Sequence, residues 1–514
     1  MMSSSVGSKV VKGTIIIVAV GILAKVSSFV AEAILAAFLG TTFKSDAYYM
    51  VSSIQAVIYP MLSVGIWKVF LPIYKEKISL ERHQEADALT NKTITFFSII
   101  SILFVVFLIV FAGPVVSIVA PGFHDQSRDL CIRLVKLSAP MYFFIIAAAI
   151  YASVLQANNK FFGSQIREVV SHIPTIVAAV FLYREFGIEV MAIALVVGGA
   201  IRLLVELPFV NWGYSFKPNF HFRDSDFRLL LSRIPSAFLS EGATQINILV
   251  DKAMASTLIA GTISALNYGQ KLMNVFSGLL STAITTALYP QIIELIALEK
   301  EEELSNLISK TINVFIIIML PVSFACILFR TELVSVVFQR GSFDEYSTYI
   351  TSNVFALYSI GLLFIAINTM INSIMYAFGN TTTPLKISVV NLIVNVSLNL
   401  ALIHYLGANG LALASSLAAL ITMIVSFVLL KKFVIVHSRA IINTGFKTII
   451  ASVFACFLPR ILFWRFPINS YWMILISASS IILLYFFFIK VLKVKELDLI
   501  ISIFKNLKRS NTSD

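Results

Sequence analysis

Long apolar runs recur from one end of this chain to the other, and each is long enough to cross a bilayer as a helix. An α-helix needs about 20 mainly apolar residues to span the hydrocarbon core. Hydrophobic residues make up 58% of the 514 residues and charged residues only 13%. The short alternating segments of a membrane β-barrel do not occur. We therefore expect an all-α polytopic membrane protein with about fourteen transmembrane helices, at 14–40, 47–74, 93–119, 133–156, 164–183, 188–212, 228–257, 265–293, 307–329, 349–378, 385–404, 409–430, 444–462 and 472–490.

Basic residues are concentrated in alternate connections between these spans, beginning with the N-terminal segment. The positive-inside rule then places both termini in the cytoplasm. The formal net charge is +12. Because the basic residues flank the spans, we expect them to contact anionic membrane lipids, and no nucleic acid. The three cysteines have neither metal-ligand spacing nor an even count, so the sequence predicts no disulfide framework and no cysteine-bound metal.

The two halves of the chain repeat one another at an offset of about 218 residues, which equals six spans. Val116-Ser117-Ile118-Val119 is echoed by Val334-Ser335-Val336-Val337, and Leu71-Pro72 by Tyr289-Pro290. This offset predicts two six-helix lobes in parallel repeat around a central cavity. Two extra C-terminal spans either pack against the lobes or form a groove for a lipid tail. The expected parts are an N-lobe at 1–222, a C-lobe at 223–432, and spans 13 and 14 with a basic cytoplasmic tail at 433–514.

The first span contains polar residues that cannot face lipid. Lys25, Ser28 and Glu32 fall on one face of a helix, and Asp46 lies near the same line. A charge at the bilayer centre costs about 2.5–3.5 kcal/mol on insertion scales, so such residues usually face a protein interior or a watery cavity. We expect these four residues to bind substrate.

The eighth span has a polar and small-residue stripe with a lysine in it. Asn267, Lys271 and Asn274 lie on this stripe, which continues through Gly278 and Ser281. Small and hydroxyl residues also pack helices together, which is the alternative interpretation. We favour a cavity wall that binds substrate, because a lysine is a poor choice for helix packing.

The seventh span has Glu241, Gln245 and Lys252 on one face, and Asn391 and Asn395 follow one another by one turn in the eleventh span. Lys252 is a further candidate for substrate binding. A carboxylate with amide oxygens suits Na⁺ or a coupling proton, so Glu241, Gln245, Asn391 and Asn395 are candidates for an ion site. An interhelical hydrogen-bond ladder explains the asparagines equally well.

Charged residues in the fifth and sixth spans are interpreted as internal pairs: Arg167 and Glu168 with His172, and Arg202 with Glu206. Cavity lining is the alternative. The sequence contains no nucleophile triad, phosphate-binding loop or dinucleotide fingerprint. We therefore do not expect an enzyme.

Several motifs together resemble the MurJ/MviN-type lipid II flippases of the multidrug/oligosaccharidyl-lipid/polysaccharide exporter superfamily. The resemblance extends through all the predicted spans. Its motifs are Gly40 to Asp46-Ala47-Tyr48-Tyr49, Phe70-Leu71-Pro72-Ile73, Ala120-Pro121-Gly122-Phe123, Tyr268 to Lys271-Leu272-Met273, Phe338 to Gly341-Ser342-Phe343-Asp344, and Thr383-Pro384-Leu385-Lys386 with Gly407 to Gly410-Leu411-Ala412.

The resemblance implies a multi-pass flippase of the bacterial inner membrane. It would move undecaprenyl-pyrophosphate-linked peptidoglycan precursor (lipid II) to the outer leaflet by alternating access, in cell-wall biosynthesis. Carried over by position, the family's basic residues are Lys25 and Lys271, and its acidic residues in this region are Glu32 and Asp46. A second arginine of the first helix is replaced by Ala31.

Lysine offers phosphate a point charge but not the bidentate fork of arginine. Export of another lipid-linked oligosaccharide, for capsule or exopolysaccharide, is therefore the alternative function. A cation-coupled drug antiporter fits less well, because the central lysines suit an anion. We expect a monomer without cofactors, with Na⁺ or H⁺ coupling and the membrane potential as candidate driving forces.

Overall fold

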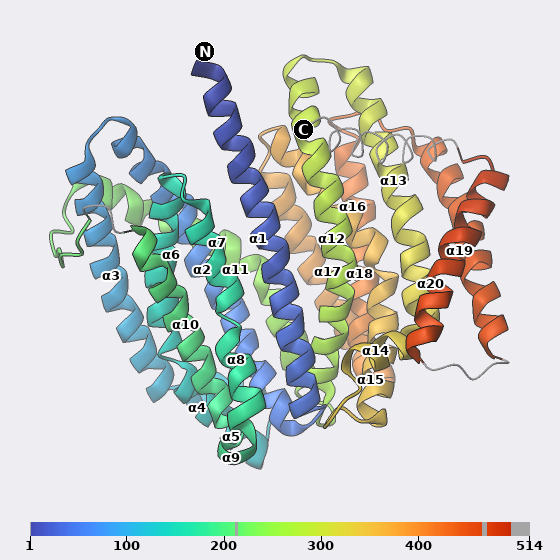
Figure 1. Cartoon of the computed structure of the whole chain (residues 1–514), viewed down its shortest axis with the longest axis horizontal. Coiled ribbons are helices and arrows are strands. Elements are labelled where there is room, and N and C mark those ends of the chain that lie inside the picture. The colour runs from blue at the N-terminus through green and yellow to red at the C-terminus, as the bar shows by residue number, and fades with distance from the viewer. Residues whose placement is uncertain (1, 211–213, 465–469, 495–514) are drawn as a thin grey trace. The chain divides into compact units, whose positions relative to one another are not determined.

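The computed structural model describes residues 2–210, 214–464 and 470–494, and every regular element within these ranges is a helix (Figure 1). An all-helical fold is expected in lipid, because a helix satisfies its own backbone hydrogen bonds. The chain forms two compact units. Unit 1 comprises Met1–Ser264 and Arg340–Phe343, and unit 2 comprises Ala265–Gln339 and Asp344–Asp514.

Unit 1 is built around the long helix α2, which packs against α6 and α11. Its core contains Phe70, Leu89, Ile150 and Phe227, all buried. Its helices are α1 (Met2–Leu39), α2 (Phe43–Ser79), α3 (His83–Val110), α4 (Ala112–Val119), α5 (Asp125–Ser138), α6 (Met141–Ala157), α7 (Phe161–Val170), α8 (Ile173–Val177), the π-helix η1 (Ala178–Leu182), α9 (Tyr183–Phe186), α10 (Glu189–Val210) and α11 (Ser225–Ala255). Helix α11, which the sequence analysis assigns to the C-lobe, thus lies in unit 1.

Unit 2 buries a second core, which includes Ile308, Phe315 and Ile371. Helix α19 packs on α13, and α20 packs on α19 and α14. The Tyr485 hydroxyl of α20 also donates a 2.5 Å hydrogen bond to the Ile317 carbonyl of α13. Unit 2 contains most of α12 (Thr262–Ala297), followed by α13 (Glu301–Leu328), α14 (Arg330–Phe338), α15 (Glu345–Ile360), α16 (Leu362–Ala377), α17 (Thr382–Leu406), α18 (Ala408–Leu430), α19 (Ser438–Trp464) and α20 (Ser470–Val491).

Two of the predicted spans are bent helix pairs. Helices α5 and α6 meet at an angle of 42°, where Pro140 interrupts the backbone hydrogen bonding. Helices α15 and α16 meet at 45° beside Gly361. The two breaks occupy corresponding places in the two halves, and α3 and α13 also correspond, with 28 residues each. Corresponding helices thus recur in the same order at these places, and the arrangement as two six-helix lobes in parallel repeat stays a prediction.

In the part of the chain that the structure describes, ten helices are long and apolar enough to cross a membrane, and the number rises to twelve if each bent pair counts as one span. Within the described residues α11 and α12, which cover two further predicted spans, are not among these twelve. The structure therefore supports a polytopic helical protein with ten to twelve candidate spans. The total of fourteen stays a prediction.

A tight crossing in unit 1 joins the end of α1 to residues 340–343. The Ser342 amide donates a 2.7 Å hydrogen bond to the Ala37 carbonyl. Gly40 and Gly341 have φ values of +56° and +58°, and a Cβ at either would overlap a carbonyl, that of Ser342 or that of Ala37. Glycine is needed here both for its positive φ and for the close approach. In this structure the Gly341-Ser342 motif therefore allows residues 340–343 to pack directly against the end of α1.

Candidate functional site

The three predicted site residues of α1 differ in their exposure within unit 1. Lys25 is exposed, Ser28 is half-buried and Glu32 is buried. The neighbouring Ser27 hydroxyl donates a 3.0 Å hydrogen bond to the Val169 carbonyl, which ties α1 to α7. Side-chain exposure along α1 therefore falls from Lys25, which is exposed, to Glu32, which is buried.

The Asp46 carboxylate caps the beginning of α12. Its Oδ1 accepts hydrogen bonds from the Ser264 amide and hydroxyl, both at 2.8 Å, and its Oδ2 accepts one from the Gly261 amide at 2.7 Å. The first amides of a helix have no partner within the helix, and a carboxylate there also interacts favourably with the helix dipole. Asp46 is only 3% exposed, so in this structure it acts as a capping residue. Its role in substrate binding stays a prediction.

Asp46→Asn is expected to lower the free energy of unfolding by about 1–3 kcal/mol, because the amide NH₂ cannot accept a hydrogen bond and leaves at least one buried donor unsatisfied. The thermal unfolding midpoint of the purified protein measures this loss. Ser264→Ala, which removes only the hydroxyl bond, should cost less. An unchanged midpoint for Asp46→Asn would contradict the capping role.

The structure brings Lys252 of α11 close to Asp46. Lys252 is buried, and its ammonium lies 5.9 Å from the centroid of the Tyr49 ring, within the range of a cation–π interaction. Its positive charge acts on the Asp46 carboxylate. Two of the predicted substrate-binding residues therefore belong to one buried group in unit 1.

The predicted stripe on α12 is partly buried within unit 2. Asn267 is buried, Lys271 is half-buried and Asn274 is exposed. Between them Tyr268 is fully buried, and its ring centroid lies 5.3 Å from that of Phe338. Along this stripe the side chains therefore become more exposed within unit 2, from Asn267 through Lys271 to Asn274.

The predicted ion-site residues belong to two different helices, α11 in unit 1 and α17 in unit 2. The Asn391 amide donates to the Thr422 hydroxyl at 3.0 Å, and the Asn395 amide to the Ser415 hydroxyl at 3.2 Å. These bonds tie α17 to α18, as the ladder interpretation expects. Gln245 is half-buried in α11, and Glu241 lies outside the residues whose side chains are described. Among the side chains that are described, no group of three or more His, Cys, Asp or Glu residues is arranged to hold a metal.

A buried ionic cluster joins α2, α7 and α10 in unit 1. Arg167 Nη1 lies 3.2 Å from Glu206 Oε1, and Arg202 Nη2 lies 3.0 Å from Glu168 Oε2. The Tyr59 hydroxyl donates a 2.6 Å hydrogen bond to Glu168, and the Arg202 guanidinium lies 4.7 Å from the centroid of the Tyr59 ring. Glu206 is fully buried. These residues do form internal ion pairs, but the partners differ from those predicted. The pairs run between α7 and α10, where the sequence predicts Arg202 with Glu206 inside α10, and together they form one network.

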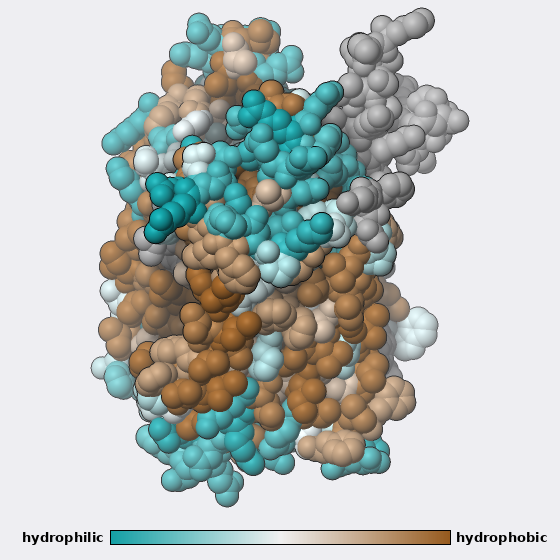
Figure 2. All heavy atoms as spheres, turned by 90° about the vertical axis from the view of Figure 1, so that its left-hand side faces the viewer, coloured by the Kyte–Doolittle hydropathy of each residue, from teal (hydrophilic) through white to brown (hydrophobic). Residues whose placement is uncertain are grey.

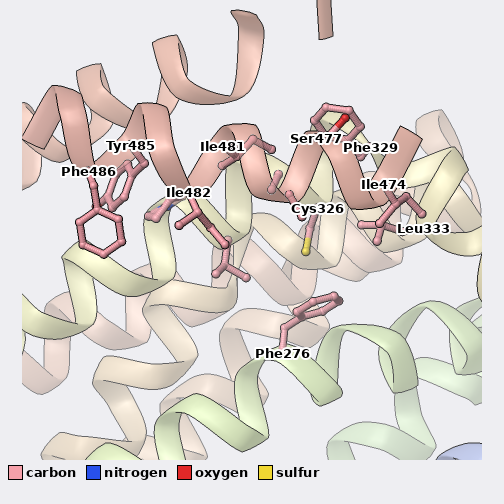
Figure 3. A pocket seen from close by; sticks show the side chains of 14 residues that line it. Phe276, Cys326, Phe329, Leu333, Ile474, Ser477, Ile481, Ile482, Tyr485 and Phe486 are labelled. Carbon is pink, nitrogen blue, oxygen red and sulfur yellow. The ribbon is translucent and has the colours of Figure 1, made fainter. Parts of the chain in front are cut away.

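Unit 2 contains an apolar cavity of about 450 Å³ between α20 and the helices α12 to α14. Figure 3 shows Phe276, Cys326, Ile481 and Ser477 around it, with Ser477 as its polar side chain. Its size and lining are typical of a site for an apolar ligand. Whether the last two spans pack against the lobes or form a groove for a lipid tail stays a prediction.

Sequence reasoning missed the partners of Asp46. Gly261 and Ser264 follow Asp46 by more than 200 residues, and the contact depends on how α2 meets the beginning of α12. The only local signal was Gly261 directly before an apolar helical run that begins at Thr262.

Known proteins resemble this chain over most of its length. The family model described as "Lipid II flippase MurJ" matches residues 35–487. A probable lipid II flippase MurJ of Buchnera aphidicola is 26% identical and covers 90% of this chain and 92% of its own length. A lipid II flippase MurJ of Burkholderia cenocepacia is also 26% identical, with 80% and 82% covered.

Solved structures show the same fold. A lipid II flippase MurJ in an inward closed conformation has a TM-score of 0.82 at 22% identity, and the match covers 95% of this chain and all of that one. An inward-facing multidrug resistance MATE family transporter of the MOP superfamily has a TM-score of 0.65 at 14% identity, with 79% and 93% covered. The family match spans nearly all the helices described above, and the chain therefore belongs to the lipid II flippase MurJ family.

Proposed function

We propose that this protein moves lipid II across the membrane from the cytoplasmic to the outer leaflet, by alternating access. The observation that carries the proposal is the family match over residues 35–487. Curated relatives that bear the name lipid II flippase align with most of the chain. The protein is a multi-pass membrane transporter, and we place it in the bacterial inner membrane with both termini in the cytoplasm.

Lys25 and Lys271 are our candidates for the cations that compensate the charge of the substrate's pyrophosphate. A pyrophosphate diester carries about two negative charges, and removing it from water requires compensating cations. Lys25 is exposed and Lys271 half-buried, so both ammonium groups are placed on accessible or partly accessible sides of their helices. Lys271 lies within the family match and Lys25 lies before its first residue. The membrane potential contributes about 2.3 kcal/mol per charge per 100 mV.

The apolar cavity in unit 2 accommodates part of the substrate's isoprenoid tail. Its lining is almost wholly apolar, and α20 forms one wall (Figure 3). A tail gains little free energy on leaving lipid for such a cavity, because lipid is equally apolar. The cavity therefore orients the tail more than it binds it.

Ala478→Trp, which fills this cavity, is expected to slow lipid II transport by about two- to fivefold, in keeping with the small gain of the tail over lipid. The exposure of lipid II on the outer leaflet of cells that depend on this protein measures the rate. Leu483→Trp on the same helix is the control, because Leu483 is 72% exposed. Equal rates in the two variants would remove the cavity from the transport path.

The finer architecture that we propose has fourteen spans, arranged as two six-helix lobes in parallel repeat, with two additional C-terminal helices. The repeated order of helices supports this arrangement. We further propose that the protein is a monomer that contacts anionic lipids.

Coupling to Na⁺ or H⁺ is a further part of the proposal, with Glu241, Gln245, Asn391 and Asn395 as the candidate residues. Glu241→Gln is expected to abolish any dependence of transport on sodium, because the amide removes the charged ligand. Transport should be measured in a sodium series at constant ionic strength. If the transport rate of the parent protein does not change with sodium, a sodium site at Glu241 is excluded.

Complementation tests the proposed cargo. A strain depleted of its lipid II flippase is expected to grow when it expresses this protein, and a mutant of a capsule or exopolysaccharide exporter is not. Rescue of the exporter mutant alone would select the other lipid-linked oligosaccharide as the cargo. Membrane abundance of the protein must be equal in the two strains.

A further inference from the structure

Part of the connection between α10 and α11 is an irregular segment held against α3, which we call the strap (residues 214–224; Figure 1). Asn91 Oδ1 accepts hydrogen bonds from the Tyr214 hydroxyl at 2.7 Å and from the Lys217 amide at 3.3 Å. One turn further along α3, the Thr95 hydroxyl accepts one from the Asn219 amide at 3.1 Å. Side chains of α3 thus satisfy backbone amides of the strap that lack a helical partner.

The far end of the strap is also fixed. The Phe222 ring packs in the core, with its centroid 5.4 Å from those of Phe96 and Phe227. Lys92 Nζ lies 2.9 Å from Asp224 Oδ2, and this hydrogen bond holds the pKa of the Asp224 carboxyl below its usual range. The strap therefore has a defined position on α3.

The sequence of α3 places the strap at the boundary of the hydrocarbon. Lys92 is the last charged residue of α3, and no charged residue follows it up to Val110. At 1.5 Å per residue this uncharged stretch is about 27 Å long, close to the ~30 Å thickness of a bilayer core. Asn91 and Thr95 lie on either side of the boundary, so the strap runs along the level where acyl chains meet headgroups.

The outer surface of the strap is aromatic and basic. Phe216 is 43% and Phe220 65% exposed, and Lys217 and Arg223 are exposed as well. From residue 214 to 223 the strap has no acidic residue. Figure 2 shows the same face of unit 1, with a hydrophilic band above a hydrophobic belt. Aromatic rings and cations are typical of the membrane interface.

A hollow of about 570 Å³ lies between the strap and the beginning of α3. Lys217, His221 and Phe220 line it from the strap, and Gln84 and Asp87 line it from α3. Asp87 is the single carboxylate among the lining residues. A cation, polar groups and an aromatic ring around one hollow suit a phosphate that is attached to an acyl-bearing molecule.

We propose that the strap binds the headgroup of an anionic phospholipid, such as phosphatidylglycerol, in the adjacent leaflet. Lys217, which lines the hollow, contacts the phosphate, and the exposed Arg223 adds a second positive charge on the strap. Phe216 and Phe220 enter the acyl region beside it. In the orientation proposed above this is the cytoplasmic leaflet. The strap leads directly into α11, whose first turn is tied to α2 through the Asp226–Lys77 ion pair. The bound lipid therefore fixes the depth at which α11 begins.

Spin-label depth measurements on the full chain in bilayers test this inference. The nitroxide is attached at Phe220→Cys, in a background in which the buried Cys131, Cys326 and Cys456 are replaced by alanine. In phosphatidylglycerol bilayers the label is expected to collide with oxygen more than with a water-soluble nickel complex. A label at Glu81→Cys, in the exposed turn between α2 and α3, is the aqueous control. Equal nickel accessibility at the two positions would overturn the proposal and indicate a soluble partner or none.

Charge variants test the headgroup itself. Lys217→Gln with Arg223→Gln is expected to weaken the preference for phosphatidylglycerol over phosphatidylethanolamine by about fivefold per charge, and to move the label toward water. Asp87→Asn is expected to change the preference in the opposite direction. If the spin label on the parent protein lies at the same depth in phosphatidylglycerol and in phosphatidylethanolamine bilayers, the assignment to anionic headgroups is overturned. These measurements need no transported substrate, so their failure is distinct from failure of the proposed flippase activity.

Discussion

Arg167→Ala is expected to lower the free energy of unfolding by about 3–5 kcal/mol. The change leaves Glu206, which is fully buried, without the guanidinium 3.2 Å away. An uncompensated carboxylate in a low-dielectric interior is strongly unfavourable, while the remaining Arg202 is already paired with Glu168. The unfolding midpoint of the purified protein in detergent measures the loss.

Two further variants separate this effect from a simple loss of packing. Replacing both partners, with Arg167→Met and Glu206→Leu, is expected to recover most of the stability, because no buried charge then remains unpaired. Arg133→Ala breaks a more exposed pair, in which Arg133 is 62% exposed and 3.5 Å from Glu189, and should cost no more than about 1 kcal/mol. Equal losses for Arg167→Ala and Arg133→Ala would show that the cluster is not a stabilising network.

The helices themselves were largely predictable, because apolar length and charge-free windows depend only on local sequence. The bends at Pro140 and Gly361 were not predicted, since a hydropathy window reports that a segment is apolar and not that it turns by 42° or 45°. A hydropathy window also gives no structural signal for residues 214–224, because they are not apolar enough to be identified as a span. Their position came from Asn91 and Thr95, whose role as acceptors appears only when α3 lies beside them.

The sequence identifies Asn391 and Asn395 as polar positions in an apolar helix, but it does not identify their partners. The spacing of Asn391 and Asn395 showed that they share a face of α17, yet the hydroxyls of Thr422 and Ser415 that they contact belong to α18. Periodicity gives the direction of a side chain relative to its own helix. It does not give the residue on the other side, which requires tertiary structure.

Lys25→Ala and Lys271→Ala are each expected to abolish rescue of a strain depleted of its lipid II flippase. Removing one cation from a desolvated pair with a pyrophosphate costs about 3–5 kcal/mol, which corresponds to a loss of more than 100-fold in binding. Neither side chain is fully buried within its unit, so the folded protein should tolerate both changes. Growth of the depleted strain, with the membrane abundance of each variant measured in parallel, gives the result.

Lys25→Arg and Lys271→Arg are the matched controls, because they keep the positive charge and add a bidentate fork that suits phosphate. Both are expected to support growth at least as well as the parent protein. If the alanine variants fail and the arginine variants succeed, charge at these positions is the requirement. Normal growth with both alanine variants would remove the lysines from the substrate path, and failure of the arginine variants would indicate that side-chain shape limits transport.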